Sequence, residues 1–281
     1  MKEIAMKISW KSKVAAFAGV LALGLIVSVS LSGKVYAQQS STNLVLYDNF
    51  DERFLDPSRW SLSGACFTRS VLECVREIQD DKLRLAVRSY GATDSNQGNG
   101  FESSELHFAN PTPIKTIAAS LTVRQASGTG CPANTANSGG HAILQGSFFN
   151  SGTGNPNDDV QALLFFNHLA TDPQGGLFGI ALMHWQGQFF GGVGLGALSV
   201  GQKIVAQLSW DQPHSQFVAS WTDVLTGKMT QVFLAYTMPD TTPPAAPDKL
   251  IGVRTFPPNC VGTQMTFADL DATFDKVWIG N

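Results

Sequence analysis

Apolar and polar residues alternate with a period of two in many short segments after the first forty positions of the chain. In residues 82–88, for example, the apolar side chains of Leu83, Leu85 and Val87 alternate with charged or small residues. This alternation predicts β-strands that bury one face and expose the other. Strands are expected at residues 44–49, 82–88, 103–108, 116–124, 142–149, 160–166, 178–185, 203–210, 217–221, 231–236 and 273–280.

The segments between these strands have the composition of turns. Glycine, proline, asparagine, serine and threonine dominate residues 91–100, 128–140 and 151–159, and a turn with Pro213 and His214 joins two of the strands into a predicted hairpin. After position 37 there is no apolar stripe with helical spacing, and no unit of about 20–50 residues repeats. These features predict an all-β fold, a sandwich of two antiparallel sheets or a barrel.

The first 37 residues have the three parts of a secretory signal peptide. Four lysines and one glutamate in residues 1–13 precede an uncharged apolar run at 14–29, and Val35 and Ala37 supply small side chains before a cleavage site. The apolar run is shorter than the roughly 20 residues that span a bilayer, which favours cleavage over the alternative, an uncleaved anchor. We therefore predict cleavage after Ala37, a secreted or extracytoplasmic location and no membrane insertion of the mature chain.

Removal of this leader makes the chain more acidic. The full sequence has 19 basic and 22 acidic residues, and residues 38–281 keep 14 and 21 of these, for a net charge of −7. Because this remainder has no basic stripe, nucleic acid is not expected as a partner.

Residues 38–281 are expected to form one domain, with two smaller domains as the alternative. Residues 239–247 have the proline-rich composition of a linker. Only 34 residues follow this segment, however, and they include Cys260. A disulfide from Cys260 to Cys131 makes the segment a surface loop within one domain, which is the reading we favour.

All four cysteines lie after the predicted cleavage site, where an oxidising compartment favours disulfides. Cys66 and Cys74 are close in sequence, whereas Cys131 and Cys260 are both flanked by loop residues. Of the three possible pairings we predict Cys66–Cys74 and Cys131–Cys260. The spacing and the export of the chain disfavour the alternative, a four-cysteine metal site.

Three segments resemble the concanavalin A-like lectin/glucanase superfamily. Residues 48–61 are similar to its opening D-x-F…L-D-P-x-x-W segment, residues 195–211 to its later strands, and residues 272–280 to its closing strand. The resemblance extends over nearly all of residues 38–281. It implies a jelly roll of two antiparallel sheets, of which the concave sheet often presents carbohydrate.

The catalytic motif of the superfamily's laminarinase-type glucanases is absent. Those enzymes carry E-x-D-x-x-E on one strand, and retaining hydrolysis needs two carboxyl groups about 5–5.5 Å apart. Residues 38–281 contain no such motif, and the segment at the corresponding place, 160–166, offers only Gln161 among apolar residues. The main reason to expect a glycoside hydrolase is therefore missing.

The segment that most resembles a catalytic strand is residues 101–108. Glu105 and His107 are two positions apart and share a strand face, whereas Glu102 faces the other way. The triplet S-E-L resembles part of the R-S-E-L-R strand of one alginate-lyase family, although Ser103 and His107 replace both arginines. If the protein is an enzyme, Glu105 and His107 are the candidate catalytic residues. The alternative is a half-exposed strand with a polar outer face.

His184 and Trp185 end an apolar segment just before a turn. An exposed tryptophan there would stack on a sugar ring, so Trp185, His184 and Glu105 are the candidate ligand-binding residues. The alternative is a tryptophan of the core. For His141 and His168 the sequence indicates no partner.

A structural calcium is the cofactor that the resemblance implies, held by backbone carbonyls and an aspartate of the closing strand. Asp275 has the position of that aspartate, and Asp48 in the opening strand is a second candidate ligand. The alternative is an edge aspartate in contact with Lys276 or Arg53. Residues 158–159 are two further aspartates, either in a calcium loop or simply solvated.

We predict a secreted, glycan-associated domain without catalytic activity. Two alternatives stay open. The first is a polysaccharide-degrading enzyme, a glycoside hydrolase or polysaccharide lyase whose site is not recognisable. The second is a structural envelope or adhesion protein. The absence of the glucanase acids favours the binding and the structural functions over the enzyme.

Overall fold

The computed structural model describes residues 43–61, 66, 72–93, 102–133, 138–262 and 265–281. The predicted leader, residues 1–37, lies outside the described residues, so its prediction stays untested. Thr42–Asn281 form one compact unit. Among the described residues, no helix has the length and apolar character needed to cross a membrane.

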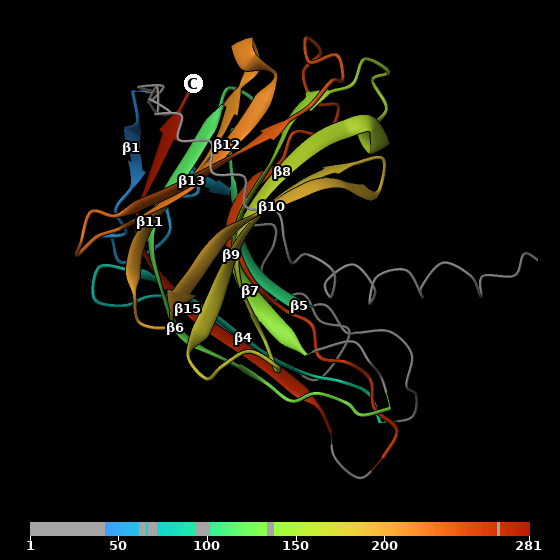
Figure 1. Cartoon of the computed structure of the whole chain (residues 1–281). Helices are drawn as coiled ribbons and strands as arrows, with labels where there is room; N and C mark the ends of the chain where they lie inside the picture. Colours follow the sequence, from blue (N-terminus) through green and yellow to red (C-terminus); the bar gives the residue numbers. More distant parts are fainter. Residues whose placement is uncertain (1–42, 62–65, 67–71, 94–101, 134–137, 263–264) are drawn as a thin grey trace, which may run out of the picture. The chain divides into compact units, whose positions relative to one another are not determined.

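One of the two antiparallel sheets, sheet A, contains both the first and the last strand of the described chain (Figure 1). Its strands are β1 (Val45–Asp48), β3 (Leu72–Ile78), β4 (Leu83–Tyr90), β6 (Thr116–Gly128), β11 (Lys203–Asp211), β12 (Gln216–Asp223), β13 (Met229–Ala235) and β15 (Phe267–Gly280). Their order is β13-β12-β11-β6-β15-β4-β3, and β1 pairs with β15.

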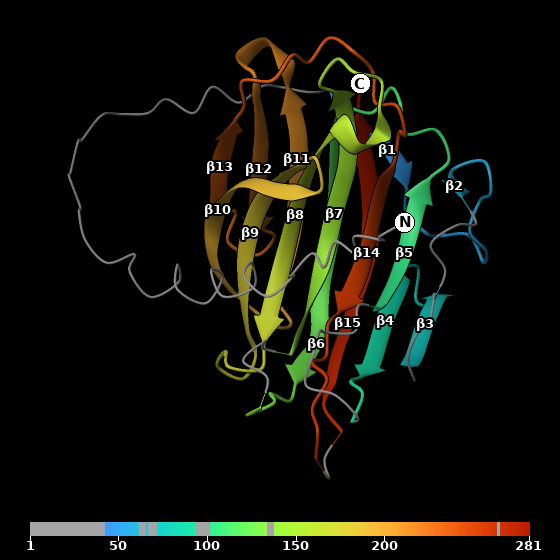
Figure 2. The same ribbon diagram turned by 90° about the vertical axis from the view of Figure 1, so that its right-hand side faces the viewer.

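The other sheet, sheet B, lies in front of sheet A in Figure 2. Its strands are β2 (Trp60–Ser61), β5 (Glu102–Phe108), β7 (Gly139–Asn150), β8 (Asp159–Leu169), β9 (Gly176–Trp185), β10 (Gln188–Ser199) and β14 (Lys249–Thr255). Their order is β10-β9-β8-β7-β14-β5-β2. The chain is therefore an antiparallel jelly-roll sandwich of two sheets, and the predicted fold class is confirmed.

The core lies between the two sheets and follows the alternation seen in the sequence. In β4, Leu83, Leu85 and Val87 are at most 1% exposed, whereas the residues between them are half-buried. The rings of Phe149 and Phe217, from the two sheets, stack with centroids 6.1 Å apart. Burial of each such large apolar side chain stabilises the fold by about 1.5–3 kcal/mol.

Every predicted strand has a counterpart in the structure, but β2, β3, β10 and β14 were not predicted. Strand β14 is buried on both faces, with Leu250, Ile251 and Val253 at most 1% exposed, so its residues form an apolar run without alternation. Strand β10 contains four glycines, which weaken a strand pattern. The turn η2 (Gln212–His214) joins β11 to β12, as predicted for the hairpin.

Both predicted disulfides are present. The Cα atoms of Cys66 and Cys74 are 5.9 Å apart, and those of Cys131 and Cys260 are 5.7 Å apart. The second bridge joins the β6–β7 connection to the β14–β15 connection and therefore links segments 129 positions apart.

Residues 239–247 connect β13 of sheet A to β14 of sheet B. Thr242 forms an isolated bridge with Asn150, and the backbone N–H groups of Ala245 and Ala246 each donate to the Asp159 carboxylate at 2.8 Å. This proline-rich segment is thus attached to the ends of β7 and β8.

Candidate functional site

The outer face of sheet B, which faces the viewer in Figure 2, brings together polar side chains from three strands, β5, β14 and β7. Strand pairing places Glu105, Gly252, Ile143 and Phe165 in one row across this face. Their neighbours along each strand point into the core, as alternation requires. We call this surface the B face. Its central residues are Glu105, His107, His141, Ile143, Gln145, Leu163, Phe165, Leu182, Leu250, Gly252 and Arg254.

Four charged residues form a continuous chain of contacts on the B face. The Asp248 carboxylate Oδ1 lies 2.7 Å from Nδ1 of His107, and Nε2 of the same ring lies 3.4 Å from Oε2 of Glu105. The other oxygen of Glu105 accepts a hydrogen bond from Nε of Arg254. The structure therefore brings the two predicted candidates, Glu105 and His107, into contact and adds one acid and one cation to them.

These contacts decide the charge of each group. The hydrogen bonds to Asp248 and Glu105 raise the pKa of His107 from 6.5 to about 9. Burial alone would raise the pKa of Glu105, but the hydrogen bond from His107 and the charge of Arg254 outweigh it, so the pKa is lowered. At neutral pH, His107 is a cation and Glu105 a carboxylate.

Two other polar side chains on the B face each hold a buried atom without a partner. Within the described residues, Nε2 of His141 and Oε1 of Gln145 form no hydrogen bond. Burial and, secondarily, the charge of Arg254 lower the pKa of His141 to about 3, so its ring is neutral. An unsatisfied buried polar atom costs about 1–3 kcal/mol, so a hydrogen-bond partner brought next to either atom would be stabilising.

Gly252 leaves room for this arrangement. A Cβ atom at position 252 would lie 2.7 Å from Cγ of Glu105 and 3.0 Å from the carbonyl oxygen of Ser104. Any larger residue would therefore push Glu105 away from Arg254. The glycine at position 252 thus lets the Glu105 carboxylate lie close to β14, the strand that carries Arg254.

An apolar strip borders the charged chain. Ile143, Leu163 and Leu250 form a cluster separate from the main core, with the half-buried side chains of Phe165 and Leu182 packed against it. The ring of His141 stacks on Phe165 at a centroid distance of 4.9 Å. The B face thus combines oriented hydrogen-bonding groups with apolar surface, as ligand sites commonly do.

The other predicted binding residues lie at the end of β9. Trp185 is half-buried against the main core, and its Nε1 donates to Oγ of Ser151 at 3.1 Å. His184 contacts Phe189 edge-on at 5.5 Å. Phe189 and Phe190 are 60% and 50% exposed, so they present more aromatic surface at this hairpin than Trp185 does.

The two predicted calcium ligands both contact groups of the chain itself. Asp48 accepts hydrogen bonds from Nε1 of Trp60 at 2.6 Å and from the backbone N–H of Phe50 at 2.8 Å. Asp275 forms an ion pair with Lys203, which is neither of the cations suggested by the sequence. The calcium site stays a prediction.

The two aspartates of the β7–β8 connection likewise accept hydrogen bonds from other groups of the chain. Asp158 accepts from Thr153 and Gln186, and Asp159 accepts from Asn150 in addition to the proline-rich segment. No three histidine, cysteine or acidic side chains in the described part of the chain are grouped to hold a metal ion. His168 is buried, with Nδ1 2.7 Å from the carbonyl oxygen of Gly176.

The sequence did not single out Arg254, Asp248 and Gln145. Arg254 belongs to a strand without alternation, and Asp248 directly precedes that strand. Gln145 lies on a strand that was predicted, and the period-two rule with Ile143 outward would have placed it on the B face. The contacts of Asp248 with His107 and of Arg254 with Glu105 join residues 141 and 149 positions apart, and such contacts have no local signal in the sequence.

No protein-family model matches the sequence, and a comparison with curated proteins finds no significant relative. Similar solved structures include the winged bean acidic lectin complexed with methyl-α-D-galactose, with 13% identity over 76% of this chain and 94% of that chain and a TM-score of 0.38. Scytalido-glutamic peptidase with a peptide-based transition-state analogue has 13% identity over 62% of this chain and 72% of that chain, with a TM-score of 0.36. The CBM2 module of the evolved Dit of Lactobacillus casei BL23 phage J-1 has 10% identity over 87% of this chain and 93% of that chain, with a TM-score of 0.36. At this level the similarities say nothing about ligand or activity.

Proposed function

We propose that the protein is an exported carbohydrate-binding β-sandwich and that the B face is its glycan-binding surface. The observation that carries the proposal is the combination of a fixed charged chain, two buried polar atoms without partners and an adjoining apolar strip on one face. A sugar ring has the complementary chemistry, because its hydroxyl groups donate and accept hydrogen bonds around an edge while its C–H groups form an apolar face. Oriented polar groups beside apolar surface give such a ligand both orientation and affinity.

The compartment supports this function. The predicted leader would export the chain, and two disulfides suit an oxidising environment outside the cytoplasm. The three segments that resemble the concanavalin A-like superfamily, whose concave sheet often presents carbohydrate, agree with glycan binding.

The same face favours binding over hydrolysis. Glu105 is held as a carboxylate by Arg254 and His107, so it lacks the raised pKa of a general acid. His107 is held as a cation by two carboxylates, so it is no base at neutral pH. We expect no hydrolysis of β-glucans, which requires two carboxyl groups with different roles.

One observation favours a second candidate, a polysaccharide lyase. The pKa values of His107 and His141 on this face are separated in opposite directions, as is common for an acid and base pair. Neutral His141 has a free Nε2, and Arg254 and protonated His107 supply the positive charge that neutralises a uronate carboxylate. Release of unsaturated products would establish this activity.

The test is a panel of soluble polysaccharides, measured for binding by calorimetry and for turnover by new reducing ends and unsaturated products. We expect the wild-type protein to bind at least one glycan. Gln145→Leu, which replaces a side chain with an unpartnered Oε1, should keep the melting temperature and weaken binding by about tenfold.

Gln231→Leu, on β13 of sheet A, is the matched control and should bind like wild type. Absence of binding across the panel would reject the proposed function, and equal affinity of both variants would reject the B face as the site. Turnover that disappears in Glu105→Gln would replace binding with catalysis as the function.

A further inference from the structure

A cleft of about 330 Å³ opens on the outer face of sheet A, on the opposite side of the sandwich from the B face. Strand pairing places Arg84, Thr273, Thr122 and Lys203 in one row across β4, β15, β6 and β11. Neighbouring strands lie about 4.8 Å apart, so this row spans about 14 Å. We call this site the A cleft, which is lined by Gln79, Asp80, Lys82, Arg84, Thr122, Arg124, Lys203, Thr273 and Asp275.

Cations outnumber carboxylates among the residues that line the A cleft, although residues 38–281 carry a net charge of −7. Four of its nine lining residues are cations and two are carboxylates. Lys203 is paired with Asp275, but the side chains of Lys82 and Arg124 form no ion pair with any residue that the structure describes. Lys82 and Arg124 are therefore two cations free to attract an anion, against one lining carboxylate, Asp80, that also has no ion pair among the described residues.

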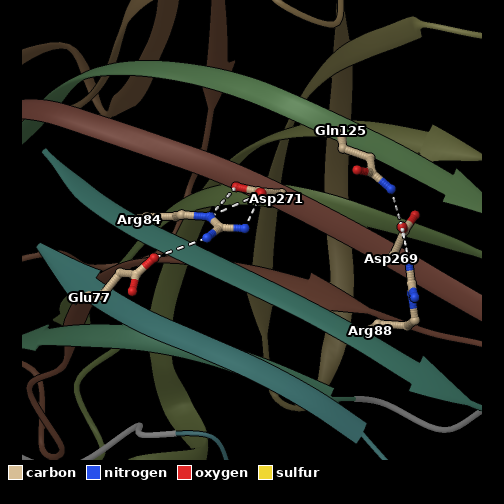
Figure 3. A network of polar contacts seen from close by, with 6 residues as sticks. All are labelled: Glu77, Arg84, Arg88, Gln125, Asp269 and Asp271. Carbon is tan, nitrogen blue, oxygen red and sulfur yellow. Dashed lines mark hydrogen bonds and ion pairs between the residues drawn. The ribbon is translucent and has the colours of Figure 1, made fainter. Parts of the chain in front are cut away.

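The side chain of Arg84, which forms one wall of the A cleft, is fixed by two residues that do not line the cleft (Figure 3). Its Nη2 donates to Asp271 at 2.9 Å and its Nη1 donates to Glu77 at 3.0 Å, and these hydrogen bonds raise the pKa of the guanidinium. A second network in Figure 3, centred on Asp269, continues along the same face. Because the Arg84 side chain is already oriented, a ligand that contacts this wall has less conformational entropy of Arg84 to remove on binding.

We infer that the A cleft binds an anionic group, a carboxylate or a sulfate, carried on a hydroxyl-rich polysaccharide. Lys82 and Arg124 meet the anion, and a guanidinium bonds two oxygens of such a group at once. The hydroxyls of Thr122 and Thr273, in the middle of the row, donate to or accept from sugar hydroxyls. This site lies on the other sheet from the B face and does not depend on its function.

The inference is tested by calorimetry of the purified exported protein with three probes. Oligogalacturonate supplies carboxylates, dextran sulfate supplies sulfates, and unmodified dextran is neutral. Wild type should bind at least one of the charged probes more tightly than dextran, and which probe binds more tightly identifies the anion. The double variant Lys82→Gln/Arg124→Gln should weaken this binding by about tenfold or more.

The matched control is Lys115→Gln/Lys228→Gln, which removes the same charge at two exposed positions outside the cleft and should bind like wild type. The double variant and its control both leave the B face unchanged, so a loss of binding confined to the double variant locates the site in the A cleft. Failure of wild type to bind either charged probe would overturn the inference. An equal loss in the control pair, or equally tight binding of polyglutamate, would do the same.

Discussion

His107 and His141 lie on one face of the same sheet, and their surroundings move their pKa values in opposite directions. His107 is flanked by the carboxylates of Asp248 and Glu105, which stabilise its charged form. For His141, burial of the ring and, secondarily, the charge of Arg254 stabilise the neutral form. Local electrostatics, and not the residue type, decide which histidine is charged at neutral pH.

The raised pKa of His107 predicts a pH-dependent contribution to stability. A group whose pKa is higher in the folded than in the unfolded state stabilises the fold below its unfolded pKa of 6.5. This contribution decreases as the pH rises and is lost above the folded pKa of about 9. We expect the stability advantage of wild type over His107→Gln to fall by about 2 kcal/mol over this range, a value reduced because Asp248 is partly exposed to solvent.

The measurement is chemical unfolding of both proteins at pH 6 and pH 9.5. Groups that titrate in both proteins cancel in the difference. Gln231→Leu, which removes no titratable group and lies on β13 of sheet A, serves as the control and should show no comparable change. An advantage that is constant with pH would contradict the proposed charge of His107.

Strand β14 assembles the B face, because it lies between β5 and β7 and carries both Arg254 and Gly252. Asp248 immediately precedes it, and Cys260 follows it in the connection to β15. The bridge from Cys260 to Cys131 ties this connection to the start of the segment that leads into β7. The strand that completes the site is thus fastened near one of its ends.

The two disulfides are expected to contribute unequally to stability. In the chain-entropy account, a bridge between cysteines 129 positions apart stabilises by about 5 kcal/mol, and one between cysteines 8 apart by about 2.5 kcal/mol. Cys131→Ala/Cys260→Ala should therefore lower the melting temperature more than Cys66→Ala/Cys74→Ala. Calorimetric melting of the two variants provides the comparison, and a larger loss for the short bridge would contradict it.

At the scale of the whole molecule, the two outer faces of the sandwich differ in chemistry. The B face places a chain of alternating charges beside apolar side chains, whereas the A cleft has more cations than acids. Both belong to a chain with an excess of acidic residues after its predicted leader. Two surfaces of different chemistry on opposite sides of one sandwich would allow simultaneous contact with two parts of a polysaccharide matrix.

Export is the premise of that function, and it predicts a defined N-terminus. The purified exported protein should begin at Gln38, because Val35 and Ala37 fit the small-residue requirement of signal cleavage. N-terminal sequencing tests this expectation. Ala37→Phe should block cleavage and leave a longer protein in the membrane fraction, and retention of Met1 in the wild-type protein would show an anchor instead.

The sequence alone determined the strand positions, the fold class, the pairing of the cysteines and the shared face of Glu105 and His107. Each of these follows from a local rule: a period of two marks a half-buried strand, and nearby or loop-flanked cysteines pair in an oxidising compartment. For two of the four strands that escaped prediction, the local rule fails. Strand β14 is buried on both faces, and β10 is rich in glycine.

Only the tertiary structure decided which groups meet Glu105 and His107. Asp248 is 141 positions from His107, and Arg254 is 149 positions from Glu105. These pairs form because β14 inserts between β5 and β7, a long-range antiparallel pairing whose register depends on the whole sandwich. The pairing of Asp275 with Lys203 arises in the same way, from strands β15 and β11 on either side of β6. Local alternation specifies the face on which a side chain lies, but the neighbours on that face come from the order of strands in the sheet.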